Sequence, residues 1–336
     1  MLQGHGDDSY RYKNIVADFS SNVWYGGEPA GLKQAIFNSW ESINHYPEVA
    51  SESLVNKIAD HHNLTPNQVL VSNGSTESIY LIAQAFRNKR TLVISPSFSE
   101  YHDACKMHGH DINFLDWDNL AENMLLDYDL VILGNPNNPT GLVLTNLAEL
   151  INYNPNVIFA VDEAFIEFTL AATSIIESIQ QFKNLIVMRS LTKIYAIPGL
   201  RLGYVAASEQ LIKKLNNFML PWAVNAFAIV AGHFIFDNYE KFKLPLLQLL
   251  GDKEIFIKQL EALQFTVRPS NTHFFIVETN SESATRLKEF LTTEFNLLIR
   301  DASNFRGLSE RCFRLATLQP EKNELLIEAL KVWQSR

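Results

Sequence analysis

The sequence predicts an α/β protein, with a large domain built on a mostly parallel sheet and a smaller α+β domain after it. Between residues 68 and 238, short apolar runs rich in Val, Ile and Leu alternate with helical segments. This alternation is typical of buried parallel strands covered by helices. From about Tyr239 the pattern changes to longer amphipathic helices and alternating strands. The 336 residues are enough for two such domains.

Composition and charge exclude several classes of protein. Hydrophobic residues make up 47% of the chain and charged residues 19%, as in soluble globular proteins with a sizeable core. The net charge of −9 argues against a nucleic-acid partner. No apolar run is long enough to span a membrane, no signal peptide is evident, and Cys105 and Cys312 lack metal-binding spacing. We expect a cytoplasmic protein with no membrane partner and no metal.

Residues 1–30 are polar and rich in turn-forming residues, which predicts an arm rather than a core element. We assign this arm to the small domain, as part of a lid. His5-Gly6-Asp7 could reach a ligand site under this lid or belong to a mobile terminus. Helices are expected over residues 32–40 and 52–61. Between them, Pro47 imposes an extended or turn geometry on Tyr46.

The adjacent residues His61 and His62 follow the second of these helices. They lack a third ligand at helical spacing, so we expect surface residues rather than a metal site.

The large domain is expected over residues 31–238. Its strands are predicted at residues 68–72, 91–95, 111–115, 129–133, 157–161, 184–189 and 203–206. Helices are predicted at residues 79–86, 101–107, 209–218 and 226–236, from their apolar or amphipathic character and the turns that bound them.

Residues able to bind a ligand follow several of these strands. Gly74-Ser75-Thr76 forms a turn at a helix start, where free N–H groups attract an anion. Phe98 can stack on a flat ring, and Asn138 lies between two Asn-Pro steps that force a defined loop. Asp162 ends another strand, where a carboxylate often binds a cofactor.

The stretch from Ser190 to Gly203 carries the strongest signal. Lys193 and Arg201 follow an apolar strand, on a segment that Pro198 prevents from forming a regular helix. We therefore expect both on a turning loop. A lysine there can form a Schiff base when burial or a neighbouring cation lowers its pKa, and Ser190 and Arg201 are suited to hold a phosphate.

The small domain is expected over residues 239–336. Its helices are predicted at residues 246–263, 283–293 and 320–333, and its strands at 265–268, 272–277, 297–299 and 312–316, with a turn over 300–307.

Together these residues match what pyridoxal 5'-phosphate (PLP) requires. The cofactor needs an acid beside its ring nitrogen, a donor to its ring hydroxyl, a lysine for its aldehyde and donors for its phosphate. These groups are supplied by Asp162, Asn138, Lys193 and the two hydroxyl-rich turns. Their order along the chain and their positions at strand ends are both consistent with a single site.

The chain resembles the fold-type I PLP enzymes of the class I/II aminotransferase family over nearly its whole length. The motifs Asn138-Pro-Thr-Gly141, Asp162-Glu-Ala164, Ser190-x-x-Lys193 and Arg201-x-Gly203 carry the resemblance. It implies a seven-stranded sheet sandwiched by helices and a homodimer with shared active sites.

The resemblance also assigns roles to single residues. Lys193 and Asp162 are catalytic, Asn138 bonds the ring oxygen, and Phe98 stacks on the ring. The phosphate ligands are Gly74, Ser75, Thr76, Ser190 and Arg201, with Tyr46 reaching the phosphate of the partner subunit. Arg314 matches the substrate-anion arginine, and Arg300 and His5 complete the expected substrate site.

Within the family, the threonine-phosphate decarboxylases of cobalamin synthesis are more similar to this chain than the histidinol-phosphate aminotransferases. The similarity lies in His5-Gly6, in Arg189 to Gly203 and in Pro221-Trp-x-Val-Asn225. The chain departs from the decarboxylase pattern at Asp7, where a glycine is expected. Phe165 replaces a tyrosine that many aminotransferases use to bond the ring oxygen, which disfavours simple transamination.

The residues leave the reaction type open. The bond at the substrate Cα that stands perpendicular to the cofactor ring is the one that breaks. If the carboxylate is held perpendicular, it leaves as CO₂; if the C–H bond is perpendicular, its proton passes to Lys193. By the resemblance we expect a small phosphorylated amino acid or amine as substrate, with decarboxylation of O-phospho-threonine in cobalamin biosynthesis as the reaction. Transamination and a non-catalytic PLP fold are the alternatives.

Overall fold

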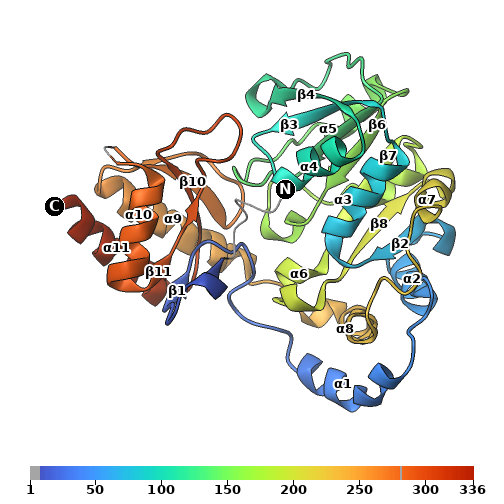
Figure 1. The fold of residues 1–336 in the computed structure, drawn as a ribbon, viewed down its shortest axis with the longest axis horizontal. Coiled ribbons are helices and arrows are strands. Elements are labelled where there is room, and N and C mark those ends of the chain that lie inside the picture. The colour runs from blue at the N-terminus through green and yellow to red at the C-terminus, as the bar shows by residue number, and fades with distance from the viewer. Residues whose placement is uncertain (1–7, 281) are drawn as a thin grey trace.

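The computed structural model describes residues 8–280 and 282–336, so His5 lies outside the described residues. It has two lobes, with the small domain on the left of Figure 1 and the large domain on the right. No helix within the described ranges is long and apolar enough to cross a membrane.

A seven-stranded sheet forms the centre of the large domain. Its order is β2 (Val69–Ser72), β8 (Gly203–Ala207), β7 (Leu185–Ser190), β6 (Ile158–Asp162), β5 (Leu130–Gly134), β3 (Arg90–Ser95) and β4 (Asp111–Asp116). Only β8 runs in the direction opposite to that of the other six strands. The predicted mostly parallel sheet is therefore confirmed.

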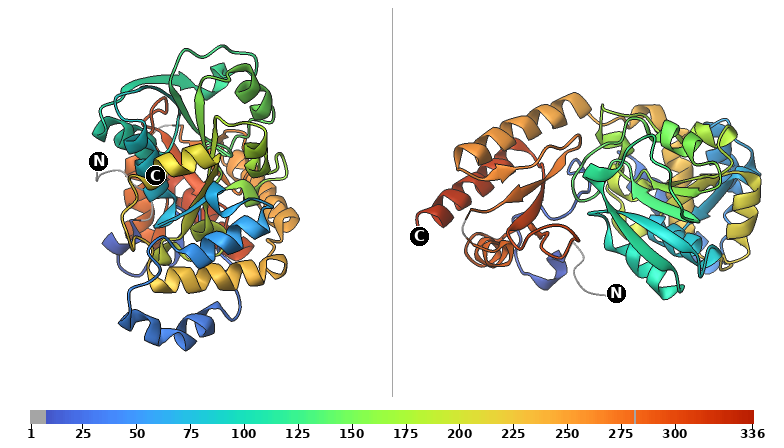
Figure 2. Two further views of the ribbon diagram at one scale, coloured as in Figure 1. Left: turned by 90° about the vertical axis from the view of Figure 1, so that its right-hand side faces the viewer. Right: turned by 90° about the horizontal axis from the view of Figure 1, so that it is seen from above.

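Helices cover both faces of this sheet, as the side and top views show (Figure 2). The apolar side chains of one face pack with α3 (Gly74–Ala85), α4 (Ser99–Met107) and α7 (Glu209–Asn216). Those of the other face pack with α2 (Glu52–His61), α5 (Leu147–Tyr153) and α8 (Ala226–Asp237), and α1 (Leu32–Asn38) lies beside α8. The strands are buried on both sides, which is why they appear in the sequence as continuous apolar runs.

The small domain packs helices against an antiparallel sheet of order β12 (Arg300–Asp301), β13 (Cys312–Ala316), β10 (Phe274–Glu278) and β9 (Thr266–Val267). Its helices are α9 (Leu246–Ala262), α10 (Ala284–Phe295) and α11 (Pro320–Gln334). Short 3-10 helices in the chain span Ser9–Arg11, Trp40–Asn44, Pro66–Gln68, Trp117–Asn119, Ile166–Phe168, Ile176–Gln180, Pro198–Leu200 and Tyr239–Lys241.

The N-terminal arm joins the small domain through β1 (Ala17–Asp18), which pairs in parallel with β11 (Leu297–Leu298). Phe19 is fully buried in the small-domain core. The expectation that the arm contributes no core element is therefore wrong, because its apolar residues need the distant residues of β11 and α9 to be covered. The limits of the two domains stay a prediction.

Three further local expectations are wrong, and one helix was not predicted. α3 begins at Gly74 rather than near residue 79, and Lys193 lies in the short helix α6 (Leu191–Ile194) rather than in a loop. Helix α5 was not predicted. His62 is buried and its Nε2 lies 2.8 Å from the Tyr204 hydroxyl, so it is no surface residue.

Candidate active site

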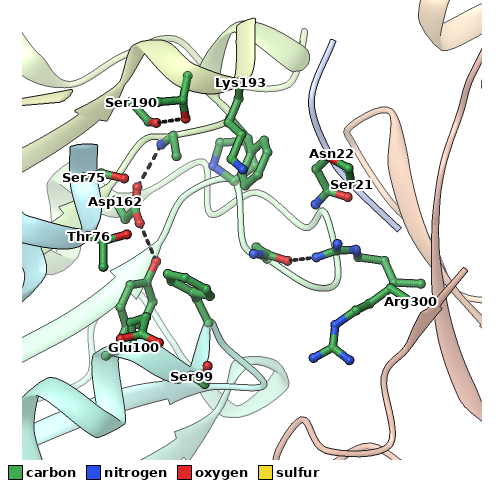
Figure 3. Close-up of a pocket in the computed structure, with 18 of the residues that line it drawn as sticks. Ser21, Asn22, Ser75, Thr76, Ser99, Glu100, Asp162, Ser190, Lys193 and Arg300 are labelled. Atoms are coloured by element: carbon green, nitrogen blue, oxygen red, sulfur yellow. Dashed lines mark hydrogen bonds between the residues drawn. The ribbon is translucent and has the colours of Figure 1, made fainter. Parts of the chain in front are cut away.

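A pocket of about 510 Å³ lies between the two domains. Figure 3 shows its large-domain side chains facing Asn22 of the arm and Arg300 of the small domain. The residues that line it are Ser20, Ser21, Asn22, Ser75, Thr76, Tyr80, Phe98, Ser99, Glu100, Tyr101, Pro136, Asn138, Asp162, Ala164, Phe165, Ser190, Thr192, Lys193, Arg201, Arg300, Phe305 and Arg314.

One end of the pocket is an anion cradle made by the first turn of α3. Ser75 and Thr76 line the pocket there, where unpaired backbone N–H groups of a helix start favour negative charge. Gly74 has a φ of +78°, and a Cβ at this position would collide with the Arg201 guanidinium. Glycine thus lets the arginine lie directly against the helix start. The Ser190 and Thr192 hydroxyls, 2.8 Å apart, complete the cradle.

Asp162 lies at the end of β6 and is buried. Its Oδ2 accepts a hydrogen bond of 2.8 Å from the Tyr101 hydroxyl, and its Oδ1 accepts one of 2.9 Å from the Ala164 N–H. Burial raises the pKa of Asp162, while these two donors and the charge of Lys193 act in the opposite direction. The carboxylate is therefore ready to pair with a cationic group in the pocket.

Lys193 is carried into the pocket by α6, directly after β7 (Figure 3). Its carbonyl accepts a hydrogen bond of 2.9 Å from the Trp24 N–H, so the arm is tied to the lysine segment. Only a short helix can form here, because Pro198 follows closely.

Asn138 and Arg314 meet across the domain interface. The Asn138 Oδ1 accepts a hydrogen bond of 2.5 Å from Arg314 Nη1, and Arg314 Nη2 donates to the Ser20 carbonyl at 2.6 Å. Burial and then the charge of Arg300 lower the pKa of Arg314 to about 9. Arg314 is therefore still cationic at neutral pH.

Arg300 is the second buried cation on this side of the pocket. Its Nη2 donates to the Asn304 Oδ1 at 2.8 Å, and its guanidinium lies 5.0 Å from the Phe305 ring centroid. Burial lowers the pKa of Arg300.

Two phenylalanines provide apolar walls. Phe98 packs edge-on against Tyr101 with ring centroids 5.9 Å apart, and Phe165 packs edge-on against Phe274 at 4.8 Å. A flat ring between Asp162 and the cradle is therefore bounded by apolar surface, which suits a cofactor of that shape.

The structure brings most of the predicted site residues to this pocket, with exceptions. Gly74 lies behind the cradle against Arg201 rather than on the pocket surface. Tyr46 is 83% exposed, packs on Trp222 and does not line the pocket.

Tyr101 and Asn22 line the pocket but were not predicted. Tyr101 follows Phe98 by three positions on a helix start, a weak sequence signal. Asn22 lies in irregular chain and had no local signal at all. Within the described ranges, no group of three or more His, Cys, Asp or Glu residues is arranged to hold a metal ion.

The chemistry of the pocket fits PLP. The cradle offers hydroxyls, helix N–H groups and an arginine to a phosphate, and the glycine at position 74 leaves room for that arginine. The buried Asp162 suits a protonated ring nitrogen, and Lys193 is the amine for an aldehyde.

Comparisons with known proteins agree with this fit. The model of the family "Aminotransferase class I and II" matches residues 14–330. The threonine-phosphate decarboxylase of Salmonella typhimurium is 32% identical over 332 residues, covering 94% of this chain and 90% of the relative. A histidinol-phosphate aminotransferase of a Thermoanaerobacter species is 33% identical, covering 86% and 84%.

A solved structure is also similar to this chain over nearly its whole length. The crystal structure of L-threonine-O-3-phosphate decarboxylase from Porphyromonas gingivalis superposes with a TM-score of 0.92 at 36% identity, covering 96% of this chain and all of that one. Members of the matched family depend on PLP. The protein therefore belongs to the class I and II aminotransferase family.

Proposed function

We propose that the protein is a PLP-dependent enzyme that decarboxylates O-phospho-L-threonine in cobalamin biosynthesis. One observation carries the proposal. The pocket holds an anion cradle at one end and two buried arginines, Arg300 and Arg314, at the other. A cofactor phosphate would occupy the first, and the two arginines suit a substrate that carries two anionic groups. The relatives named threonine-phosphate decarboxylase support this choice of substrate.

The residues that would hold the cofactor follow from the geometry. Ser75, Thr76, Ser190 and Arg201 would bind its phosphate, and Asp162 its ring nitrogen. Asn138 keeps its Nδ2 hydrogens for the ring oxygen, because its Oδ1 is taken by Arg314. When bound, the cofactor captures the substrate amine and draws electrons from the bond that breaks.

The chain's own residues decide which bond that is. Arg314 and Arg300 bind the substrate carboxylate and phosphate, and so turn the substrate about its Cα. When the carboxylate leaves as CO₂, a proton returns to the same carbon, and the Lys193 Nζ is the group in the pocket able to deliver it. The product is a phosphorylated amino alcohol.

Phe165 lines the pocket, and many aminotransferases of the family carry at this position a tyrosine that bonds the ring oxygen. An apolar ring there leaves this oxygen to Asn138 alone, which supports a reaction other than simple transamination.

The alternative is a histidinol-phosphate-type aminotransferase that passes an amino group to a 2-oxo acid. The relative at 33% identity favours it, and the same cradle, aspartate and lysine serve that reaction. Arg300 and Arg314 would then bind the substrate phosphate and the carboxylate of the oxo acid.

One assay separates the two functions. The purified holoenzyme is incubated with O-phospho-L-threonine, or with histidinol phosphate and 2-oxoglutarate, and CO₂ and glutamate are measured. We expect CO₂ from the first mixture. Glutamate from the second without CO₂ from the first would make the aminotransferase the function. The absence of both products and of cofactor absorbance would indicate a non-catalytic protein.

We further propose that the enzyme is a cytoplasmic homodimer. Exposed apolar side chains gather on the 3-10 helix after α1, on the chain that follows it and on the chain before α8. Trp40 packs there on Phe227 of α8, and Tyr46 packs on Trp222. Exposed apolar patches of this kind mark interfaces. Pairing through this surface would bury it, and Tyr46 would reach the phosphate cradle of the partner subunit.

A further inference from the structure

Buried polar atoms without partners gather at the substrate side of the pocket and behind it. Nine buried side-chain nitrogen and oxygen atoms lack a hydrogen bond among the described residues, and six of them belong to Asn22, His273, Arg314 and Thr317. Each of these four residues is at most 5% exposed. An unpaired buried polar group costs about 1–3 kcal/mol. The three atoms of Asn22 and Arg314 belong to residues that line the pocket, where its ligand can pair them. His273 and Thr317 do not line it, so their three atoms indicate a partner other than the pocket's ligand.

Backbone hydrogen bonds bring three distant segments together at this place. The Thr317 N–H donates to the His273 carbonyl at 2.8 Å, and the Ala316 N–H donates to the Phe19 carbonyl at 2.9 Å. The arm thus runs along the end of the small-domain sheet. Asn22 and Arg314 line the pocket, whereas His273 and Thr317 lie behind them. Figure 3 shows Asn22 on the side of the pocket opposite Ser75 and Thr76.

The ring of His273 is held firmly in place. It stacks on Phe168 with centroids 4.1 Å apart and packs edge-on against Phe274 at 5.4 Å. It lies against the Asn22 backbone, but neither ring nitrogen has a partner at hydrogen-bond geometry.

Burial, helped by the charges of Arg314 and Lys193 and opposed by the Asn22 backbone, lowers the pKa of His273 to about 3. The imidazole is therefore neutral near pH 7, with one nitrogen that donates and one that accepts.

We propose that His273 and Thr317 hold an ordered water against Asn22, which makes His273 a positioning residue for two residues of the pocket wall, Asn22 and the substrate-binding Arg314. Water is the occupant that matches the chemistry, because it needs two to four polar partners and can donate and accept at once. The inference rests on the proposed function for its effect on substrate, but not for the water site itself.

A simpler role for His273 is that of an aromatic filler between Phe168 and Phe274. Phenylalanine would then replace it without harm. The two roles differ in what the nitrogens do, so variants that remove nitrogens but keep the shape distinguish them.

The first test measures His273→Phe and Thr317→Val holoenzymes with O-phospho-L-threonine. We expect KM to rise about tenfold in each, which corresponds to about 1.4 kcal/mol. We expect kcat to change less and PLP affinity to stay within about twofold. Thr317→Val is nearly isosteric, so it keeps the test valid if His273→Phe folds poorly. His273→Gln, which restores a donor and an acceptor, should recover part of the loss.

The matched control is His110→Phe. His110 is also buried, but both of its ring nitrogens are paired, with Thr91 Oγ1 at 2.6 Å and the Ala83 carbonyl at 2.8 Å. This variant should lose thermal stability without a change in KM. Unchanged KM in both His273→Phe and Thr317→Val, or a parallel loss of PLP affinity, would overturn the positioning role.

The second test is a crystal structure of the PLP-bound protein. Wild-type density should show a water bonded to His273 and Asn22, and His273→Phe should lack it. A dry site in the wild type rules the inference out. If the wild type turns over neither phosphorylated substrate, the proposed function fails, and the water density still decides this inference.

Discussion

At the scale of single residues, the site depends on groups whose ionic states burial controls. Two hydrogen-bond donors partly offset the rise in the pKa of Asp162 that burial causes. Arg314 stays cationic because its pKa is about 9. These residues are costly to bury and contribute to function rather than to stability.

Replacing Lys193 by alanine should abolish turnover and the absorbance of covalently held cofactor, because Lys193 is the only lysine among the residues that line the pocket. The variant should keep its circular dichroism spectrum, since a cavity at the surface of α6 leaves the sheet intact. Lys213→Ala, at an exposed position of α7, is the control and should retain full activity. Normal turnover in Lys193→Ala would refute the assignment.

Asp162→Asn should stabilise the apoprotein near neutral pH while weakening PLP binding. The native pKa of Asp162 is raised above 3.8, so between 3.8 and the native pKa the folded state binds more protons than the unfolded state. Wild-type stability therefore falls as the pH rises through this window, and asparagine removes the fall. Urea unfolding of both apoproteins from pH 4 to 8 should show an advantage for the variant that shrinks toward pH 4. A constant difference would contradict the ionisation argument.

At the scale of elements, helix starts and strand ends place the site residues. The carboxyl ends of the parallel strands meet at one edge of the sheet, where β6 presents Asp162, β7 presents Ser190, and α6 follows with Lys193. Because β8 runs in the opposite direction, it begins at this same edge, and Arg201, just before it, lies beside the start of α3. The cradle thus combines residues from two segments about 120 positions apart.

Gly74→Ala should weaken PLP binding at least about tenfold. The backbone conformation at position 74 disfavours any side chain, and the new Cβ would displace the Arg201 guanidinium. Equilibrium dialysis of PLP against the apoprotein measures the effect. The control is Gly251→Ala in α9, where nothing lies within 4 Å of the added Cβ. It should leave PLP affinity unchanged and raise stability by about 0.5–1 kcal/mol. Equal PLP affinity in the two variants would count against the cradle.

At the scale of the whole molecule, the two domains and the arm close around one pocket, and an aromatic surface remains uncovered. The side chains of this surface are between 46% and 83% exposed, and they belong to Phe37, Trp40, Ile43, Tyr46 and Trp222. Such a patch is expected to be buried by a second copy of the chain.

Trp40→Glu should convert a dimer into a monomer in analytical ultracentrifugation, because a carboxylate would be buried in an apolar interface. Tyr46→Phe should leave the dimer intact and weaken PLP by about 1–2 kcal/mol, the contribution of one hydrogen bond to a charged group. The matched control is Leu125→Glu, an exposed apolar position on the loop after β4, and it should change neither property. A wild type that is fully active as a monomer would contradict the shared active site.

The sequence by itself predicted a mostly parallel sheet, the succession along the chain of its strands and of its helices except α5 and the short α6, and the residues at its strand ends. Apolar runs and helical periodicity are local properties, and parallel strands bring their carboxyl ends together whatever the rest of the chain does. Asp162, Ser190, Lys193 and Arg201 could therefore be placed at one site from their positions alone, and the structure brings them to one pocket.

Only the tertiary structure decided the contacts between distant segments. The Ser20 carbonyl meets Arg314 across 294 positions, Tyr101 meets Asp162 across 61, and Phe19 is buried by a domain that begins more than 200 residues later. His62 and His273 look like ordinary polar residues until Tyr204 and Phe168 enclose them. Burial, pairing and the resulting pKa values depend on the space around a side chain, and that space is created only when remote parts of the chain pack together.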